Sequence, residues 1–165
     1  MVTIGGAGDA SLIVRLIHES FREYEDRLDP PSAALNETAE SVAKELHDGA
    51  TSFVATIDGV AAGCVIARPK GRNLYFGRLA VLPAFRGLGI ARLLVGAVEG
   101  ESVRRGCDGV VLAVRIALPE NQRFFARLGY VEVSRSAHPG FVEATAIEMS
   151  KHVINPARGN VAELL

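Results

Sequence analysis

The chain has 165 residues, of which 48% are hydrophobic, and its 18 lysines and arginines nearly balance its 19 aspartates and glutamates. This length and composition favour one domain with a full hydrophobic core and exclude an intrinsically disordered chain. The net charge of −1 and the lack of any apolar stretch of transmembrane length predict a cytoplasmic protein that binds neither nucleic acid nor a membrane.

The first half of the chain is predicted to alternate between helices and strands. Asp9 is placed to cap the first helix, and Asp58-Gly59 is a strong signal for a two-residue hairpin turn. We expect, in chain order, a strand at 2–4, a helix from 10 to about 24, a weaker helix over 36–47 and strands over 51–57 and 60–67.

The second half continues this alternation and predicts an α/β fold, a mixed sheet with helices on both faces. We expect a turn at 69–73, a strand over 74–82, a helix over 89–105, a strand over 109–115, a helix over 119–128 and strands near 130–135 and 141–149. The domain is predicted to span 1–150, followed by a C-terminal extension, 151–165. The apolar end of that extension, 161–165, is a candidate to pack on the domain or on a second copy in a homodimer.

The most informative segment is the loop 82–91 between the predicted strand 74–82 and the next helix. Gly87 and Gly89 allow the backbone to bend sharply and to approach a ligand with no Cβ in the way. The first amides of the helix have no partner inside it, and its dipole places partial positive charge there. This combination predicts a phosphate-binding site.

Two common phosphate motifs do not fit this loop. A P-loop requires a Gly-Lys-Ser/Thr ending, and no lysine lies between Lys70 and Lys151. A dinucleotide-binding fingerprint requires a third small residue three positions after Gly89, where the chain has Arg92. The two cysteines, Cys64 and Cys107, indicate reduced thiols and no metal site.

The loop instead carries Arg86-x-x-Gly89-x-Ala91, which resembles the Gln/Arg-x-x-Gly-x-Gly/Ala motif of the GNAT family of N-acetyltransferases. The resemblance covers roughly residues 50–150, with order and spacing kept. It includes the strand before the loop, the segment Asn121–Tyr130 and the closing strand around Ala146–Met149. It implies the GNAT fold, with a mostly antiparallel central sheet, and an acetyltransferase that uses acetyl-CoA and needs no metal.

The resemblance also implies which residues bind acetyl-CoA. The pantetheine arm would contact the strand backbone at Leu79, Ala80 and Val81, and the side chain of Asn121. The pyrophosphate would bind amides of the loop, with the Arg86 side chain adding a direct charge. The full set of implied cofactor-binding residues is Leu79, Ala80, Val81, Arg86, Gly87, Leu88, Gly89, Ile90, Ala91, Asn121, Phe124 and Phe125.

The catalytic acid and base are where this chain departs from the family pattern. The family often has a Tyr that protonates the thiolate, and this chain has Phe125 at that position. The family also often has a Glu that acts as base on the strand before the loop, whereas the strand 74–82 carries no carboxylate. Two replacements are predicted: Tyr75 as acid or water-holder, and His138, whose ordinary pKa of about 6.5 suits proton transfer. Both have ordinary alternatives, packing for Tyr75 and a surface role for His138. Further candidates, each of which can equally be a solvated surface group, are Glu23, Tyr24, Glu25 and Glu143.

The expected activity is therefore acetyl transfer from acetyl-CoA to a primary amine by direct attack. A non-catalytic acyl-CoA-binding regulatory module and a transferase that uses a longer acyl-CoA remain as alternatives. The acceptor is not determined by the sequence; the acidic residues Glu23, Glu25, Asp26 and Asp29 are compatible with a cationic amine.

Overall fold

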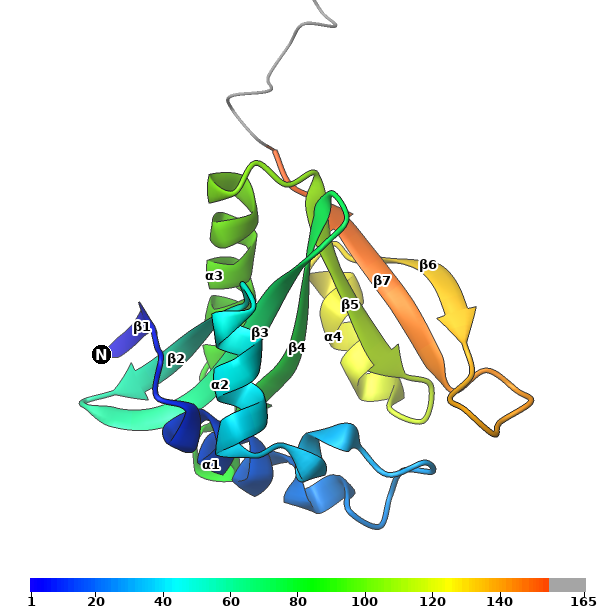
Figure 1. The fold of residues 1–165 in the computed structure, drawn as a ribbon, viewed down its shortest axis with the longest axis horizontal. Coiled ribbons are helices and arrows are strands. Elements are labelled where there is room, and N and C mark those ends of the chain that lie inside the picture. The colour runs from blue at the N-terminus through cyan, green and yellow to red at the C-terminus, as the bar shows by residue number, and fades with distance from the viewer. Residues whose placement is uncertain (155–165) are drawn as a thin grey trace, which may run out of the picture. The chain divides into compact units, whose positions relative to one another are not determined.

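The computed structural model describes residues 1–154 and confirms the mixed α/β architecture (Figure 1). Seven strands form one sheet in the order β1-β2-β3-β4-β5-β7-β6. The pairs β1–β2, β2–β3, β5–β7 and β6–β7 are antiparallel, whereas β4–β5 is parallel. In chain order the elements are β1 (Val2–Gly6), α1 (Ala10–Phe21), η1 (Arg22–Tyr24), η2 (Ala33–Asn36), α2 (Ala39–His47), β2 (Thr51–Ile57), β3 (Val60–Lys70), β4 (Asn73–Val81), η3 (Pro83–Phe85), α3 (Ile90–Arg104), β5 (Gly109–Arg115), α4 (Pro119–Arg127), β6 (Val131–Ser136) and β7 (Ala146–His152).

The chain divides into two compact units. The first consists of Met1–Arg68 and Phe76–Ala97, and the second consists of Pro69–Tyr75 and the described residues from Val98 onward. The candidate phosphate loop, 82–91, lies wholly in the first unit. The tip of the β3–β4 hairpin, α4 and the last three strands lie in the second.

Side-chain caps set the starts of the first two α-helices. The Asp9 carboxylate accepts a hydrogen bond of 3.0 Å from the amide of Leu12, as the sequence predicts for α1. For α2, the Thr38 hydroxyl accepts from the Ser41 amide, and the Ser41 hydroxyl accepts from the Thr38 amide. This reciprocal cap starts α2 at Ala39, so the predicted start at Asn36 was three residues too early.

In the first unit, helices cover both faces of the sheet. Ile13, Leu16 and Ile17 of α1 and Val42 of α2 form one core cluster with Val54, Cys64, Ile66 and Ala80 of β2, β3 and β4. Figure 1 shows α1 and α2 beside these strands. Gly63, next to Cys64 in β3, points to the opposite face, because a Cβ added there would lie 3.4 Å from the Cδ1 atom of Leu94 in α3.

Two tight turns shape the hairpins of β2, β3 and β4. Asp58 and Gly59 both have positive φ, 49° and 83°, as a type I′ turn requires, which confirms the predicted hairpin. The next turn is shorter than predicted. Gly71, with φ of 59°, reverses the chain, so β3 continues through Pro69 and Lys70 rather than ending at Ala67.

In the second unit, β5 pairs with β4 and β7, and β6 is the edge strand of the sheet. The buried hydroxyl of Ser102 in α3 donates to the carbonyl of Gly109, which attaches the helix to the start of β5. β7 begins at Ala146, five residues after the predicted start. The Phe141 amide donates to the His138 carbonyl at 3.0 Å, so this segment forms a turn rather than a strand.

The described residues contain neither a membrane-spanning helix nor a metal-binding cluster of side chains. No helix within residues 1–154 has the length and apolar character needed to cross a bilayer. No group of three or more His, Cys, Asp or Glu side chains in that range is arranged to hold a metal ion. The predicted packing of 161–165 concerns residues outside the described range.

Candidate functional site

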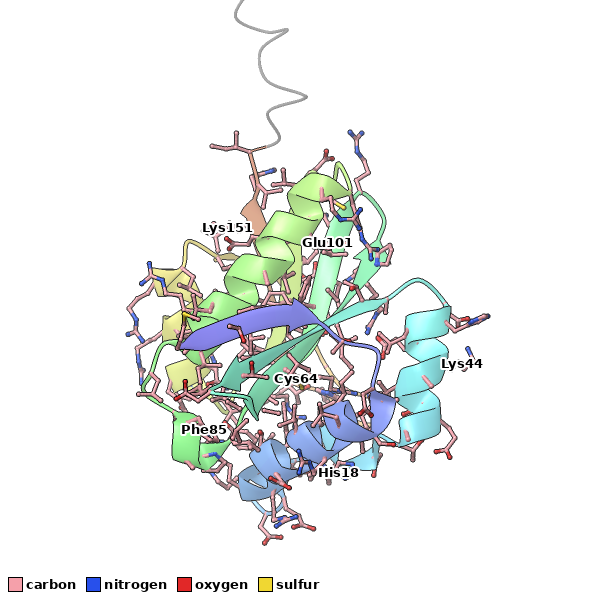
Figure 2. The ribbon with its side chains drawn as sticks, turned by 90° about the vertical axis from the view of Figure 1, so that its left-hand side faces the viewer. His18, Lys44, Cys64, Phe85, Glu101 and Lys151 are labelled. Atoms are coloured by element: carbon pink, nitrogen blue, oxygen red, sulfur yellow. The ribbon has the colours of Figure 1, made fainter. Side chains whose placement is uncertain are left out.

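The loop between β4 and α3 has the conformation that its glycines predict. β4 ends at Val81, η3 covers Pro83–Phe85, and Gly87 and Gly89 then adopt φ of 78° and 80°. An L-residue rarely adopts such angles, so these two positions require glycine. A Cβ added at either glycine meets nothing within 4 Å, so the space beside the backbone is open. Phe85, labelled in Figure 2, marks this loop.

The first turn of α3 completes the arrangement. α3 has 15 residues and begins at Ile90, and its first turn contains no acidic side chain. The Leu93 amide donates to the Gly89 carbonyl, so the amides before Leu93 have no acceptor inside the helix. The helix therefore presents amides and partial positive charge to the open space beside Gly87 and Gly89.

α3 buries an apolar stripe on one face. Leu93 is 46% exposed, whereas Ile90, Leu94, Val95 and Val98 are buried. The buried face runs along the four-residue spacing from Ile90 through Leu94 to Val98 and includes Val95 on its flank. Leu93 lies on the opposite flank, beyond the edge of that face.

The Arg86 side chain is already bound to other parts of the first unit. Its Nη1 atom is 2.6 Å from Oε1 of Glu23 in η1, and its Nη2 atom donates to the Ser20 carbonyl of α1 at 3.2 Å. Its Nε atom donates to the Val81 carbonyl at 3.1 Å. In the structure this guanidinium joins the loop to the end of α1 and to β4, and the predicted contact of Arg86 with phosphate stays a prediction.

The strand before the loop lies close to β3 at the predicted pantetheine contact. Ala80 is buried, and the Leu82 amide donates to the Ala62 carbonyl at 2.8 Å. A Cβ added to Gly63 would lie 2.5 Å from the Ala80 carbonyl oxygen and 3.3 Å from the Val81 Cα atom. Sequence reasoning missed Gly63, although an isolated glycine inside a strand is a signal of close backbone approach.

A half-buried ion pair holds Arg78 of β4, the residue just before the predicted contact Leu79. Arg78 has φ of 55°, which is uncommon for a residue with a side chain, and its Nη2 atom is 3.0 Å from Oε1 of Glu37. The Glu37 carbonyl in turn lies 2.8 Å from Nε2 of His18, which Figure 2 labels in α1. Glu37 therefore ties β4 and α1 to the segment just before α2.

The parallel pairing of β4 with β5 is short. Its register covers only Asn73, Leu74 and Tyr75 of β4, opposite Gly109, Val110 and Val111 of β5. Within the described chain, the remaining β4 residues, which include the predicted contacts Leu79, Ala80 and Val81, make no ladder with β5. Backbone groups on that side of β4 are thus not used by β5.

The predicted contacts from α4 belong to the second unit. Asn121 lies in the first turn, and its amide donates to the Leu118 carbonyl at 3.1 Å. Phe125 is buried, with its ring edge-to-face against Phe124 and Tyr130 at centroid distances of 5.1 and 6.1 Å. Tyr130 is a core residue, and its hydroxyl donates to Glu99. Burial, assisted by the Glu99 carboxylate, raises the pKa of Tyr130, so that this phenol is a poor proton donor.

The two predicted catalytic side chains also lie in the second unit. Tyr75 occupies the paired end of β4, with the Lys70 ammonium 5.5 Å from its ring centroid. It precedes the predicted pantetheine contact Ala80 by five positions along β4. His138 lies half-buried in the β6–β7 loop, where its amide donates to Thr145 Oγ1 at 2.9 Å and its Nδ1 atom is hydrogen-bonded to the same hydroxyl.

The surroundings of His138 favour its neutral form. Burial, followed by the charge of Arg115, lowers the pKa of the imidazole below its ordinary value of 6.5. Both causes penalise the imidazolium, so the neutral ring predominates near pH 7. A neutral imidazole is the form that can accept a proton.

Comparison with known proteins identifies a family. Residues 13–130 match the model of the acetyltransferase (GNAT) family. The match begins within α1, includes the loop 82–91, α3 and α4, and ends at Tyr130.

Solved structures share the fold at low sequence identity. The chain resembles the ribosomal-protein-alanine N-acetyltransferase of Escherichia coli, with 20% identity, coverage of 93% of this chain and 94% of that one, and a TM-score of 0.71. It also resembles the PaiA N-acetyltransferase of Thermoplasma acidophilum in complex with coenzyme A, with 15% identity, coverage of 92% and 99%, and a TM-score of 0.78. A third structure, nourseothricin acetyltransferase, is 25% identical over 66% of this chain and 68% of that one, with a TM-score of 0.60.

Proposed function

This chain belongs to the acetyltransferase (GNAT) family, and we propose that it transfers an acetyl group from acetyl-CoA to a primary amine by direct attack. Family membership supports the coarser activity, acyl transfer from an acyl-CoA to nitrogen. The acetyl donor and the amine acceptor are our proposal.

The observation that carries this proposal is the conformation of the loop 82–91. Gly87 and Gly89 have positive φ with open space beside them, and α3 begins directly after them with unpaired amides. These features support a pyrophosphate site, because the first amides of a helix favour an anion and no side chain fills the space beside the two glycines. The residues proposed to bind through their backbone here are Arg86, Gly87, Leu88, Gly89, Ile90 and Ala91.

The proposed pantetheine contacts extend from this loop along β4. The backbone of Leu79, Ala80 and Val81 has no ladder with β5, so it retains hydrogen-bonding capacity for a ligand. The Val81 carbonyl is taken by Arg86, which leaves the amides as the more available groups. The family resemblance implies further acetyl-CoA contacts from Asn121, Phe124 and Phe125 of the second unit, and we retain them as proposed binding residues.

The reaction needs few side chains. A neutral amine attacks the thioester carbonyl carbon, the C–N bond forms, and the C–S bond breaks with release of the CoA thiolate. The amine nitrogen loses one proton and the thiolate gains one. A backbone amide near Val81 is proposed to polarise the carbonyl. His138 is proposed to take the proton from the acceptor, and Tyr75 is the second candidate for a proton-transfer role.

The decisive experiment is an assay for free CoA thiol with acetyl-CoA and a panel of amines, including small amines, peptides with free N-termini and lysine-containing peptides. Steady thiol release that depends on an amine supports the transferase. Tight binding of acetyl-CoA by calorimetry, with no turnover on any amine, would favour the non-catalytic binding module instead. A rate that increases from acetyl-CoA to longer acyl-CoA donors would favour the longer-chain transferase.

A further inference from the structure

We propose that Glu23 is a positioning residue for acyl-CoA binding, acting through Arg86 to hold the phosphate loop against the end of α1. This inference rests on the proposed function, because it assumes that the loop 82–91 binds the pyrophosphate of an acyl-CoA. It assigns the Arg86 side chain to structural support of the loop and leaves the phosphate contacts to backbone amides.

The contacts of Arg86 involve all three nitrogens of its guanidinium group and three of its five N–H groups. Each of the three nitrogens has a partner: Nη1 pairs with Oε1 of Glu23 at 2.6 Å, Nη2 donates to the Ser20 carbonyl, and Nε donates to the Val81 carbonyl. A guanidinium held in this way is directed toward α1 and β4, so turning it toward a phosphate would weaken these contacts.

The position of Arg86 makes this attachment important for the loop. Arg86 immediately precedes Gly87, and its own backbone is extended, with φ of −72° and ψ of 156°. Glycine has a broad range of accessible conformations, so a loop with glycines at 87 and 89 needs support from its flanks to keep one shape. α3 supplies one flank, and the Arg86 side chain supplies the other.

Among the partners of Arg86, only Glu23 can be removed by substitution. Ser20 and Val81 bind Arg86 through backbone carbonyls, which every residue provides. Glu23 and Arg86 are about 40% exposed, at 37% and 41%, so the pair contributes modestly to overall stability. A Glu23→Gln variant should therefore fold normally and report on the loop.

The sign of the affinity change in Glu23→Gln separates the two possible roles of Arg86. If Arg86 supports the loop, the variant loses an ion pair that holds it, and acetyl-CoA binds about two- to fivefold more weakly, the range for a partly exposed pair. If Arg86 binds phosphate directly, Glu23 competes with the ligand, and Glu23→Gln makes binding tighter. Calorimetric titration with acetyl-CoA measures this change, and the melting temperature verifies that each variant is folded.

Two further variants test whether Glu23 acts through Arg86. In an Arg86→Met background, Glu23→Gln should have no further effect on acetyl-CoA affinity, because the partner is already gone. Glu25→Gln is the matched control. It removes the same charge from the same segment, and Glu25 makes no ion pair with any residue from 1 to 154, so it should not weaken binding.

Different outcomes would overturn the positioning role of Glu23 and the proposed function on which it rests. Unchanged or tighter binding in Glu23→Gln would overturn the positioning role, as would equal weakening in Glu25→Gln or an additive loss in the double variant. Absence of acetyl-CoA binding by the wild-type chain would overturn the proposed function itself.

Discussion

Gly63 of β3 and Ala80 of β4 approach so closely that a Cβ on Gly63 would lie 2.5 Å from the Ala80 carbonyl oxygen. Side chains do not tolerate such a distance to backbone, so any larger residue must push the two strands apart. Ala80 and Val81 are proposed to contact the pantetheine arm. The size of residue 63 therefore controls the position of the backbone that is meant to hold the cofactor.

We expect Gly63→Ala to lower the free energy of unfolding by about 1–3 kcal/mol, the usual cost of overpacking. Acetyl-CoA binding should weaken as well, because the shifted backbone belongs to the proposed site. Gly96→Ala is the control: Gly96 lies in α3 with nothing within 4 Å of an added Cβ, so the substitution should stabilise the helix slightly. Chemical unfolding and calorimetry measure both quantities. Normal stability in Gly63→Ala would contradict the close packing.

Substitution of Gly89 tests the phosphate loop. We expect Gly89→Leu to reduce acetyl-CoA affinity at least tenfold, or about 1.4 kcal/mol, because a side chain would fill the space in which the pyrophosphate should lie. Gly140→Leu is matched for strain, since Gly140 also has positive φ and open space, but it lies in the β6–β7 loop. If both variants lose affinity equally, or neither does, the assignment of the loop fails.

Phe125→Tyr tests the missing acid. The ring is only 7% exposed and packs against Phe124 and Tyr130. If the CoA thiolate leaves without a side-chain acid, the variant should bind acetyl-CoA nearly as well as the wild type, with turnover that is unchanged or modestly higher. Calorimetry measures the acetyl-CoA affinity, and steady-state kinetics with the best amine of the panel measures the turnover. A collapse of turnover with binding retained would show that Phe125 shapes the acceptor site instead.

The pH dependence of the rate tests His138. Because burial and Arg115 lower the pKa of His138, kcat/KM should rise with pH through an inflection below 6.5 and then level off. His138→Ala should remove this inflection and reduce the rate about 100-fold, the lower end for a lost general base. Thr145→Val, which removes the hydroxyl bonded to Nδ1, should keep the inflection but shift it. If His138→Ala kept the wild-type pH profile and rate, His138 would not be the base, and Tyr75, Glu23 and Glu25 would be the next candidates.

Two buried serines of the first unit allow a test of stability. The Ser20 hydroxyl is 3% exposed and has no hydrogen-bond partner among the described residues, whereas the buried Ser52 hydroxyl donates to the Ala7 carbonyl. Ser20→Ala should leave the melting temperature unchanged or raise it, because it removes an unsatisfied polar group. Ser52→Ala should destabilise by about 1 kcal/mol. A clear loss of stability in Ser20→Ala would show that this hydroxyl has a partner such as a bound water.

The sequence by itself determined the local features of this protein. Asp9 caps α1, Asp58-Gly59 forms the hairpin turn, and Gly87 and Gly89 adopt the positive φ expected of them. Each of these depends on residues that are close together in the chain, where caps and turns have specific chemical requirements. The order of helices and strands was predictable for the same reason, with errors mainly at element ends such as the start of β7.

Only the tertiary structure decided which side chains support the site. Arg86 meets Ser20 across 66 positions, and Arg78 meets Glu37 across 41. No local pattern predicts that η1 brings Glu23 to the Arg86 guanidinium. Gly63 lies beside Ala80 because of the strand register, which no local pattern specifies. Contacts between distant segments depend on how elements pack, and packing is set by the whole core rather than by any one motif.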